Sequence, residues 1–130
     1  MKDLYLMFSL GSEYHAISIE EVLEVVPKVS LKPLENMPDY VRGSFYCRGK
    51  LLPVVDIAYK KYGRISQNSF STRIMVMETN YRKGEVRQSI GLLVEELTDL
   101  LRGCAREDVR YVKIEDLLSL ENLKEIFLSI

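Results

Sequence analysis

Short apolar stretches, separated by turn-forming residues about every ten positions, constrain the fold of this chain more than any other feature. Apolar and polar side chains alternate in Leu4–Leu10, as is typical of a strand with one buried face. Tyr14–Ile17 can return as its partner strand after a turn at Gly11. Further strands are predicted at Ser44–Arg48, Leu51–Asp56, Arg73–Glu78, Ser89–Val94 and Val109–Ile114. This pattern favours a mainly β fold of small barrels or a sandwich over alternating strands and helices.

Helical periodicity is confined to a few short segments. Ser18 and Glu21 have the spacing of a capping box, and the apolar residues that follow predict a helix over Ile19–Val26. The C-terminal segment Glu115–Leu128 is amphipathic, and its apolar face would carry Leu117, Leu120, Leu123 and Phe127. The sequence therefore predicts an early helix and a closing helix around a β-rich body.

Several connections can also be assigned from turn chemistry. Gly49–Lys50 is suited to the tight turn of a hairpin between Ser44–Arg48 and Leu51–Asp56, with glycine at the first central position. Asp56 can cap a short helix that ends at Gly63. Ile65–Ser71 is polar and predicts a loop, whereas Glu95–Leu101 fits a helical turn or a strand.

The composition limits both the size and the chemistry of the molecule. A chain of 130 residues that is 47% hydrophobic and 28% charged can form one domain, residues 1–130, with a real core. The net charge of −1 and the pI near 5.9 oppose nucleic acid as the main ligand, because phosphate binding requires a surplus of cations. No apolar run approaches the roughly eighteen residues of a membrane span, so we expect a soluble protein without direct membrane insertion.

The residues that most often carry chemistry are sparse. Cys47 and Cys104 are far apart in sequence, which is typical of reduced thiols in the cytoplasm, although a single bridge between them stays open. His15 is the only histidine, and we expect it at the surface or at a sheet edge. No glycine-rich phosphate loop and no cluster of metal ligands occurs in the sequence. These observations predict neither a metal nor another cofactor.

Three acidic residues could in principle form a catalytic carboxylate pair. Asp56 is far in sequence from the adjacent pair Glu95 and Glu96, and the sequence cannot show that these carboxylates converge. Asp56 is already explained as a helix cap. A small β-barrel enzyme using Asp56 and Glu95 therefore remains an alternative to a binding module, and the sequence favours the binding module.

A dense cluster of turn and charged residues surrounds the predicted hairpin. It comprises Pro38–Gly43, Arg48–Gly49 and Leu51–Asp56. The simple interpretation is a glycine-punctuated hairpin with arginines on its solvated edge. Alternatively, the planar guanidinium of Arg48, held on a stiff hairpin, would recognise a carboxylate or backbone carbonyls of a partner.

At these residues the chain resembles the CheW-like domain, the coupling protein family of bacterial chemotaxis. Five blocks match in order: Phe8–Tyr14 with Ile17–Val25, Met37–Gly43, Cys47–Gly49 with Leu52–Asp56, Thr72–Glu78 and Ile90–Glu95. The resemblance implies two intertwined, five-stranded SH3-like barrels without catalytic activity. It also implies an adaptor that couples a CheA-type histidine kinase to the cytoplasmic tip of a methyl-accepting chemoreceptor.

The same resemblance assigns binding roles to individual residues. It places receptor binding at Arg48, with Gly43 and Gly49 in the same region. It places kinase binding at Glu24, with neighbouring residues Val22 and Val25. It therefore implies two partner surfaces on one domain.

The chain also departs from the family pattern. Tyr46-Cys47 stands where an Asn-Leu type pair is usual, and Glu95 stands where an aspartate is usual. The path from Leu101 to the closing helix is short, so the second barrel is expected to be incomplete. Such a chain could have kept one partner, serve a pathway other than chemotaxis, or form a homodimer through an exposed barrel edge.

Overall fold

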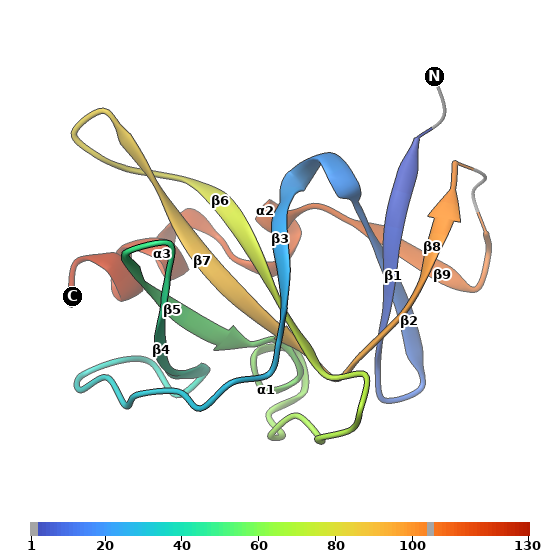
Figure 1. Cartoon of the computed structure of the whole chain (residues 1–130), viewed down its shortest axis with the longest axis horizontal. Coiled ribbons are helices and arrows are strands. Elements are labelled where there is room, and N and C mark those ends of the chain that lie inside the picture. The colour runs from blue at the N-terminus through green and yellow to red at the C-terminus, as the bar shows by residue number, and fades with distance from the viewer. Residues whose placement is uncertain (1–2, 104–105) are drawn as a thin grey trace.

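Two β-sheets form the body of the protein in a computed structural model that describes residues 3–103 and 106–130 (Figure 1). The strands are β1 (Leu4–Leu10), β2 (Glu13–Ser18), β3 (Val22–Pro27), β4 (Val41–Cys47), β5 (Lys50–Asp56), β6 (Arg73–Lys83), β7 (Val86–Val94), β8 (Glu96–Arg102) and β9 (Val109–Val112). The helices are η1 (Ile19–Glu21), α1 (Ile57–Tyr62), α2 (Ile114–Leu117) and α3 (Leu120–Phe127). Cys104 and its predicted thiol state lie outside the described residues.

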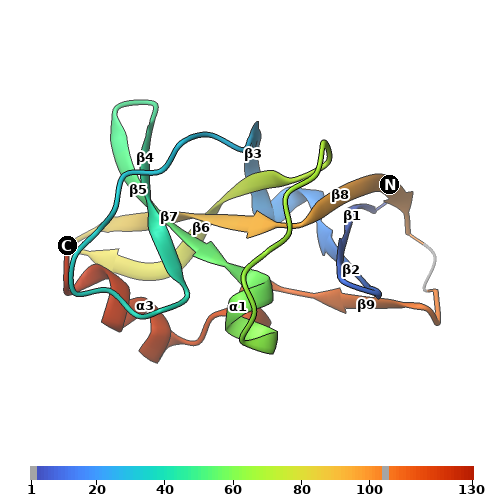
Figure 2. The same ribbon diagram turned by 90° about the horizontal axis from the view of Figure 1, so that it is seen from below.

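The chain crosses between the two sheets twice, so that neither sheet is a separate unit (Figures 1 and 2). β1 and β2 start the first sheet, β3 to β7 build the second sheet, and β8 and β9 return to the first. The first sheet has the order β8-β1-β2-β9 and the second β3-β6-β7-β5-β4. The predicted mainly β class is confirmed. In the described residues the first sheet has four strands rather than five.

The largest apolar cluster lies between the sheets and joins them into one core. Phe8, Met75 and Leu92 from the strands are fully buried in it, together with Ile126 of α3. A second cluster around Met7, Ala16 and Val109 belongs to the first sheet. A third cluster around Val54, Ile74 and Leu93 belongs to the five-stranded sheet. Each sheet therefore buries residues on both of its faces.

The predicted helix over Ile19–Val26 is wrong. Only one 3₁₀ turn forms, in which the Ser18 hydroxyl accepts from the Glu20 N–H at 3.3 Å. The chain then continues as β3, which pairs antiparallel with β6. Helical spacing and a strand were both compatible with this segment, and its β-branched valines pair well across a sheet. Sheet pairing therefore determined the structure here.

The prediction that His15 lies at the surface is also wrong, because its side chain is fully buried. β2 pairs with β1 so that His15 is opposite Phe8, and the two rings stack with centroids 5.4 Å apart. Burial lowers the pKa of His15 to about 4, and the ammonium of Lys61, 2.9 Å from Nε2, adds to the effect. The ring is therefore neutral at physiological pH.

The C-terminal segment forms two short helices instead of the single predicted one. The chain breaks at Leu118–Ser119, where the Ser119 hydroxyl caps α3 by accepting from the Asn122 N–H at 3.1 Å. The break turns Leu120 outward, where 53% of it is exposed, and brings Leu118, Leu123, Ile126 and Phe127 into the core. The stacking of Phe127 on Tyr81, with centroids 5.3 Å apart, fixes α3 against β6.

Other local predictions are confirmed. Asp56 caps α1 by accepting from the Tyr59 N–H at 3.1 Å, and Gly63 ends that helix with φ 75°. The undecided segment after Glu95 is a strand, β8. The hairpin turn lies one residue earlier than predicted, at Arg48–Gly49, because Cys47 pairs with Lys50.

Candidate partner-binding site

The residues assigned to the two partners meet at one end of the five-stranded sheet. Its edge strands β3 and β4 are not hydrogen-bonded to each other as neighbours. At the β4–β5 turn, Arg48 Nε donates to Glu24 Oε1 of β3 at 2.9 Å. The side chain of Arg48 is 80% exposed and that of Glu24 is 30% exposed. This ion pair therefore links the β4–β5 turn to β3 at this end of the sheet. Most of the Arg48 side chain stays exposed to solvent.

The backbone of Arg48 is unusual for its residue type. Its φ is 53° and that of Gly49 is 80°, the pattern of a two-residue turn in which both central residues are left-handed. Glycine, asparagine or aspartate suit the first of these positions, whereas a left-handed arginine costs about 1 kcal/mol. The local backbone preference does not explain why arginine occupies this position.

An apolar groove of about 330 Å³ lies beside the ion pair. Its lining includes the apolar residues Leu23 and Leu52 and the cations Arg48 and Lys50. The Cys47 thiol lies 3.7 Å from Glu24 Oε1, and burial together with this carboxylate raises the pKa of the thiol. The groove therefore combines apolar walls with an exposed cationic edge and a thiol that stays protonated.

The other assigned residues are less exposed. Val22 and Val25 are half-buried and pack against the main core. Gly43 is buried with φ 140°, and a Cβ at this position would lie 2.5 Å from the carbonyl oxygen of Lys32. Glycine thus allows the chain before β4 to approach that strand, where Lys32 bridges Ser44. Gly43 shapes the edge of the barrel, and Gly49 shapes its turn.

Two exposed residues at this end were not predicted from the sequence. Leu23 is 58% exposed beside the groove, and Tyr46 is 65% exposed, with the Lys32 ammonium 5.8 Å from its ring centre. The exposure of Leu23 was missed because the segment was predicted as a helix. In the strand that forms instead, Leu23 points away from the core. Tyr46 departs from the family pattern, and its exposure on β4 follows from the alternation with Phe45.

The carboxylate of Asp56 is a buried structural anchor. It is fully buried and accepts four hydrogen bonds: from Tyr59 N, Ser66 N, Ser66 Oγ and Arg42 Nε. Its acceptor sites are therefore used to fix the start of α1 and the loop that follows this helix. This arrangement explains Asp56 without acid–base chemistry.

Glu95 anchors the same loop from the other side. Its buried carboxylate accepts from Arg64 at 2.5 and 3.0 Å, from the Gln67 N–H at 2.7 Å and from the Gly11 N–H at 2.7 Å. The hydrogen bonds from Arg64 lower the pKa of Glu95 to about 2, and the backbone donors add to the effect against the opposing influence of burial. Glu96 is exposed and accepts from Ser9 Oγ. The three acidic residues are therefore engaged separately.

In residues 3–103 and 106–130, no three His, Cys, Asp or Glu side chains are grouped so that they could hold a metal ion. None of the helices in this part of the chain is both long enough and apolar enough to cross a membrane.

Comparison with known proteins gives a consistent family match. The model of the CheW-like domain matches residues 4–110. The chemotaxis protein CheW of Helicobacter pylori is 28% identical over 98 residues, which are 75% of this chain and 56% of that protein. The chemotaxis protein CheW of Klebsiella aerogenes is 26% identical over 97 residues, 75% of this chain and 55% of that protein. The chain spans about half the length of the curated relatives it matches.

A solved structure shows the same architecture. The crystal structure of the scaffolding protein TtCheW from Thermoanaerobacter tengcongensis has a TM-score of 0.79 to this chain at 23% sequence identity. The match covers 98% of this chain and 94% of that chain. The fold of this chain, including its C-terminal part, is therefore that of a known scaffolding protein.

Proposed function

Since the chain belongs to the CheW-like domain family, we propose that it is a non-enzymatic adaptor that couples a CheA-type histidine kinase to methyl-accepting chemoreceptors. It would work in the cytoplasm at the receptor arrays. The observation that carries the proposal is the Arg48 turn. An exposed guanidinium is held in an unfavourable backbone conformation above an apolar groove, and its only ion pair within the described residues, with Glu24, is solvent-exposed and of the kind that contributes little to stability.

The chemistry of the groove fits a protein partner better than a small molecule. Arg48 can donate two parallel hydrogen bonds to a carboxylate, and the groove beside it can take an apolar side chain. Aromatic and arginine residues beside an apolar centre are typical of protein interfaces, and Tyr46 lies on the same hairpin. We assign the receptor tip to Arg48, with Gly43 and Gly49 holding the backbone that presents it.

We assign kinase binding to Glu24, with Val22 and Val25 as its neighbours. Glu24 is tied to Arg48, and Val22 and Val25 reach the surface only in part. These residues therefore share a surface with the receptor site. A second candidate function follows from that overlap: a diverged adaptor that binds one partner only, or that serves a two-component pathway outside chemotaxis. The open edge of the four-stranded sheet at β8 also offers a place for a homodimer.

Receptor binding tests the proposal directly. Arg48→Ala should weaken the affinity for a receptor-tip fragment by about 1–3 kcal/mol, because the hydrogen bonds of Arg48 would be buried in the complex. Arg106→Ala is the control, since Arg106 also forms a solvent-exposed ion pair, with Asp108, elsewhere on the surface. Isothermal titration with both variants decides the case. Equal affinities for the parent and Arg48→Ala would remove the receptor site from this turn.

A further inference from the structure

A hollow of about 470 Å³ lies between α1, β9 and α2, away from the residues assigned to the two partners. α1 contributes Lys60 and Lys61 to its lining, β9 contributes Arg110, and α2 contributes Asp116. None of these residues lines the groove beside Arg48. A hollow of this volume is in the range of sites that bind small molecules.

The only acidic residue in the lining is engaged by its own helix. Asp116 Oδ2 accepts from the Lys113 N–H at 2.7 Å and so caps the start of α2. In the part of the chain that the structure describes, no ion pair joins Asp116 to a cation of the hollow. The three cations of the lining therefore keep most of their positive charge.

Lys61 is fixed in place by a partner that carries no charge. Its Nζ lies 2.9 Å from Nε2 of the fully buried His15 and 3.5 Å from Glu13 Oε1, and its side chain is 29% exposed. The neutral ring of His15 can accept a hydrogen bond from the ammonium but cannot balance its charge. Glu13 also accepts from the Tyr62 hydroxyl. Lys61 is thus positioned precisely, and Glu13 is its only counter-charge within ion-pair distance.

The other two cations of the hollow have no carboxylate partner. β9 pairs parallel with β2, and the register places the exposed Arg110 opposite His15. Lys60 Nζ lies 5.6 Å from the ring centre of Tyr40. Among the described residues, neither Arg110 nor Lys60 forms an ion pair. Two positive charges at this hollow are therefore uncompensated.

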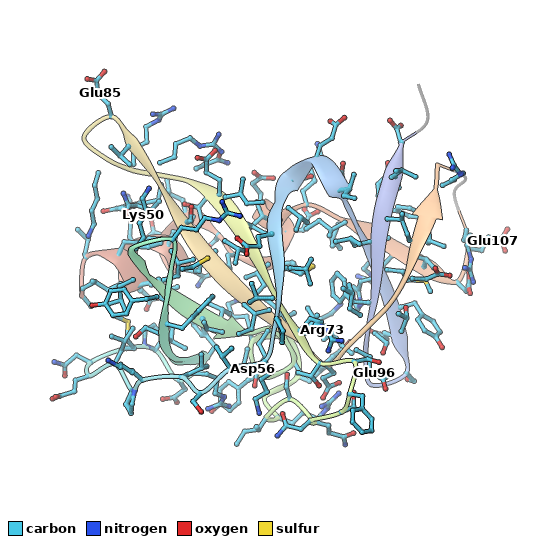
Figure 3. The ribbon with its side chains drawn as sticks, in the orientation of Figure 1. Lys50, Asp56, Arg73, Glu85, Glu96 and Glu107 are labelled. Atoms are coloured by element: carbon cyan, nitrogen blue, oxygen red, sulfur yellow. The ribbon has the colours of Figure 1, made fainter. Side chains whose placement is uncertain are left out.

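Three further acids lie near Arg110 but outside this lining. Glu13, Glu107 and Asp108 line a second hollow that Arg110 also borders. Asp108 is paired with Arg106 at 2.6 Å. Figure 3 shows Glu107 at the margin of the molecule, where it points outward. An anion would therefore meet less repulsion in the hollow beside α1.

The chemistry of the lining indicates the class of ligand. A phosphate monoester carries close to two negative charges at neutral pH, which matches two uncompensated cations better than the single charge of a carboxylate does. The guanidinium of Arg110 can donate two parallel hydrogen bonds to phosphate oxygens. The rest of the lining includes the apolar side chains of Ile57, Val112 and Leu117, which could cover an apolar group attached to the phosphate.

We propose that the hollow between α1 and β9 binds a phosphate monoester with a small apolar body, whose phosphate contacts Arg110 and Lys61 while Lys60 adds positive charge. This ligand site goes beyond the adaptor function, and neither proposal depends on the other.

NMR titration of the full chain tests the site with three probes: phenyl phosphate, benzoate and inorganic phosphate. Phenyl phosphate should bind most tightly and shift the backbone amide signals of Lys61 and Arg110. Benzoate should bind more weakly because it carries one charge, and inorganic phosphate because it lacks the apolar body. Arg110→Gln should weaken the binding of phenyl phosphate at least fivefold. The matched control is Arg102→Gln, which removes an exposed arginine of β8 and should leave the affinity unchanged.

Each contrary result overturns a stated part of the inference. If millimolar phenyl phosphate shifts none of these signals, or if the parent and Arg110→Gln bind it equally well, the site is wrong. Equal losses in Arg110→Gln and Arg102→Gln would show unspecific attraction to positive charge and would also overturn it. Benzoate binding as tightly as phenyl phosphate would exclude the phosphate assignment, and inorganic phosphate doing so would exclude a role for the apolar lining. No kinase or receptor is present in these titrations, so none of these failures affects the proposed adaptor function.

Discussion

The two ends of the five-stranded sheet present exposed side chains in different ways. At the Arg48 end, a residue in an unfavourable backbone conformation is balanced by a solvent-exposed ion pair with Glu24. At the other end, the loop between α1 and β6, which carries the exposed Phe70, has ordinary backbone geometry and rests on two buried carboxylates. The hydrogen bonds of the buried carboxylates therefore stabilise the Phe70 loop, whereas the backbone at Arg48 is locally strained. Substitutions of the buried carboxylates should accordingly lower stability far more than substitutions of Arg48.

The largest effect is expected at Asp56. Asp56→Ala removes the acceptor of four hydrogen bonds and leaves the charge of Arg42 without its buried partner. The free energy of unfolding should fall by about 3–5 kcal/mol. Urea denaturation measures this change, and Asp108→Ala, at an exposed ion pair, should stay within about 0.5 kcal/mol of the parent. A small loss for Asp56→Ala would mean that the loop does not depend on this anchor.

The Glu95 anchor should make the stability of the protein depend on pH. The pKa of Glu95 is about 2 in the folded protein, below its ordinary value of 4.5. Its stabilisation is therefore fully present above about pH 4.5 and is lost as the pH falls toward 2. The shift corresponds to on the order of 3 kcal/mol.

The variant Glu95→Gln separates this contribution from other titrating groups. It should be less stable than the parent by about 2–3 kcal/mol at pH 7, and its stability should fall less between pH 4.5 and 2. Urea denaturation at a series of pH values gives both quantities. Parallel pH profiles for parent and variant would show that Glu95 is not the titrating anchor.

The difference between the ends also explains what the sequence could predict. Turn and cap chemistry is local, so Asp56 and Gly63 were correctly predicted as the ends of α1. The turn at Arg48 was predicted, one residue too late, because the family motif and the signal for a hairpin coincide there. Phe70 lies in a polar loop, and no local pattern distinguishes an exposed aromatic residue held by distant carboxylates from a disordered one.

Two of the wrong predictions, the early helix and the exposed histidine, have a common physical origin in sheet pairing. The segment from Val22 to Val26 satisfies helical spacing, but β6 offers it a partner strand. His15 is polar, yet its register with β1 places it opposite Phe8 inside the core. Likewise, Asp56 and Glu95 suggested a reacting pair only until their separate donors were known. Contacts between residues distant in sequence decided each case.

The smallest effect distinguishes strain from ion pairing at the Arg48 turn. Arg48→Gly removes the cost of a left-handed side chain, whereas Arg48→Ala keeps most of that cost and loses the same ion pair. The glycine variant should therefore be more stable to urea than the alanine variant by about 1 kcal/mol, although both should lose receptor affinity alike. Equal stabilities would show that the turn is unstrained. In that case the left-handed conformation of Arg48 would cost no stability, and the presence of an arginine at this position would no longer support a binding role.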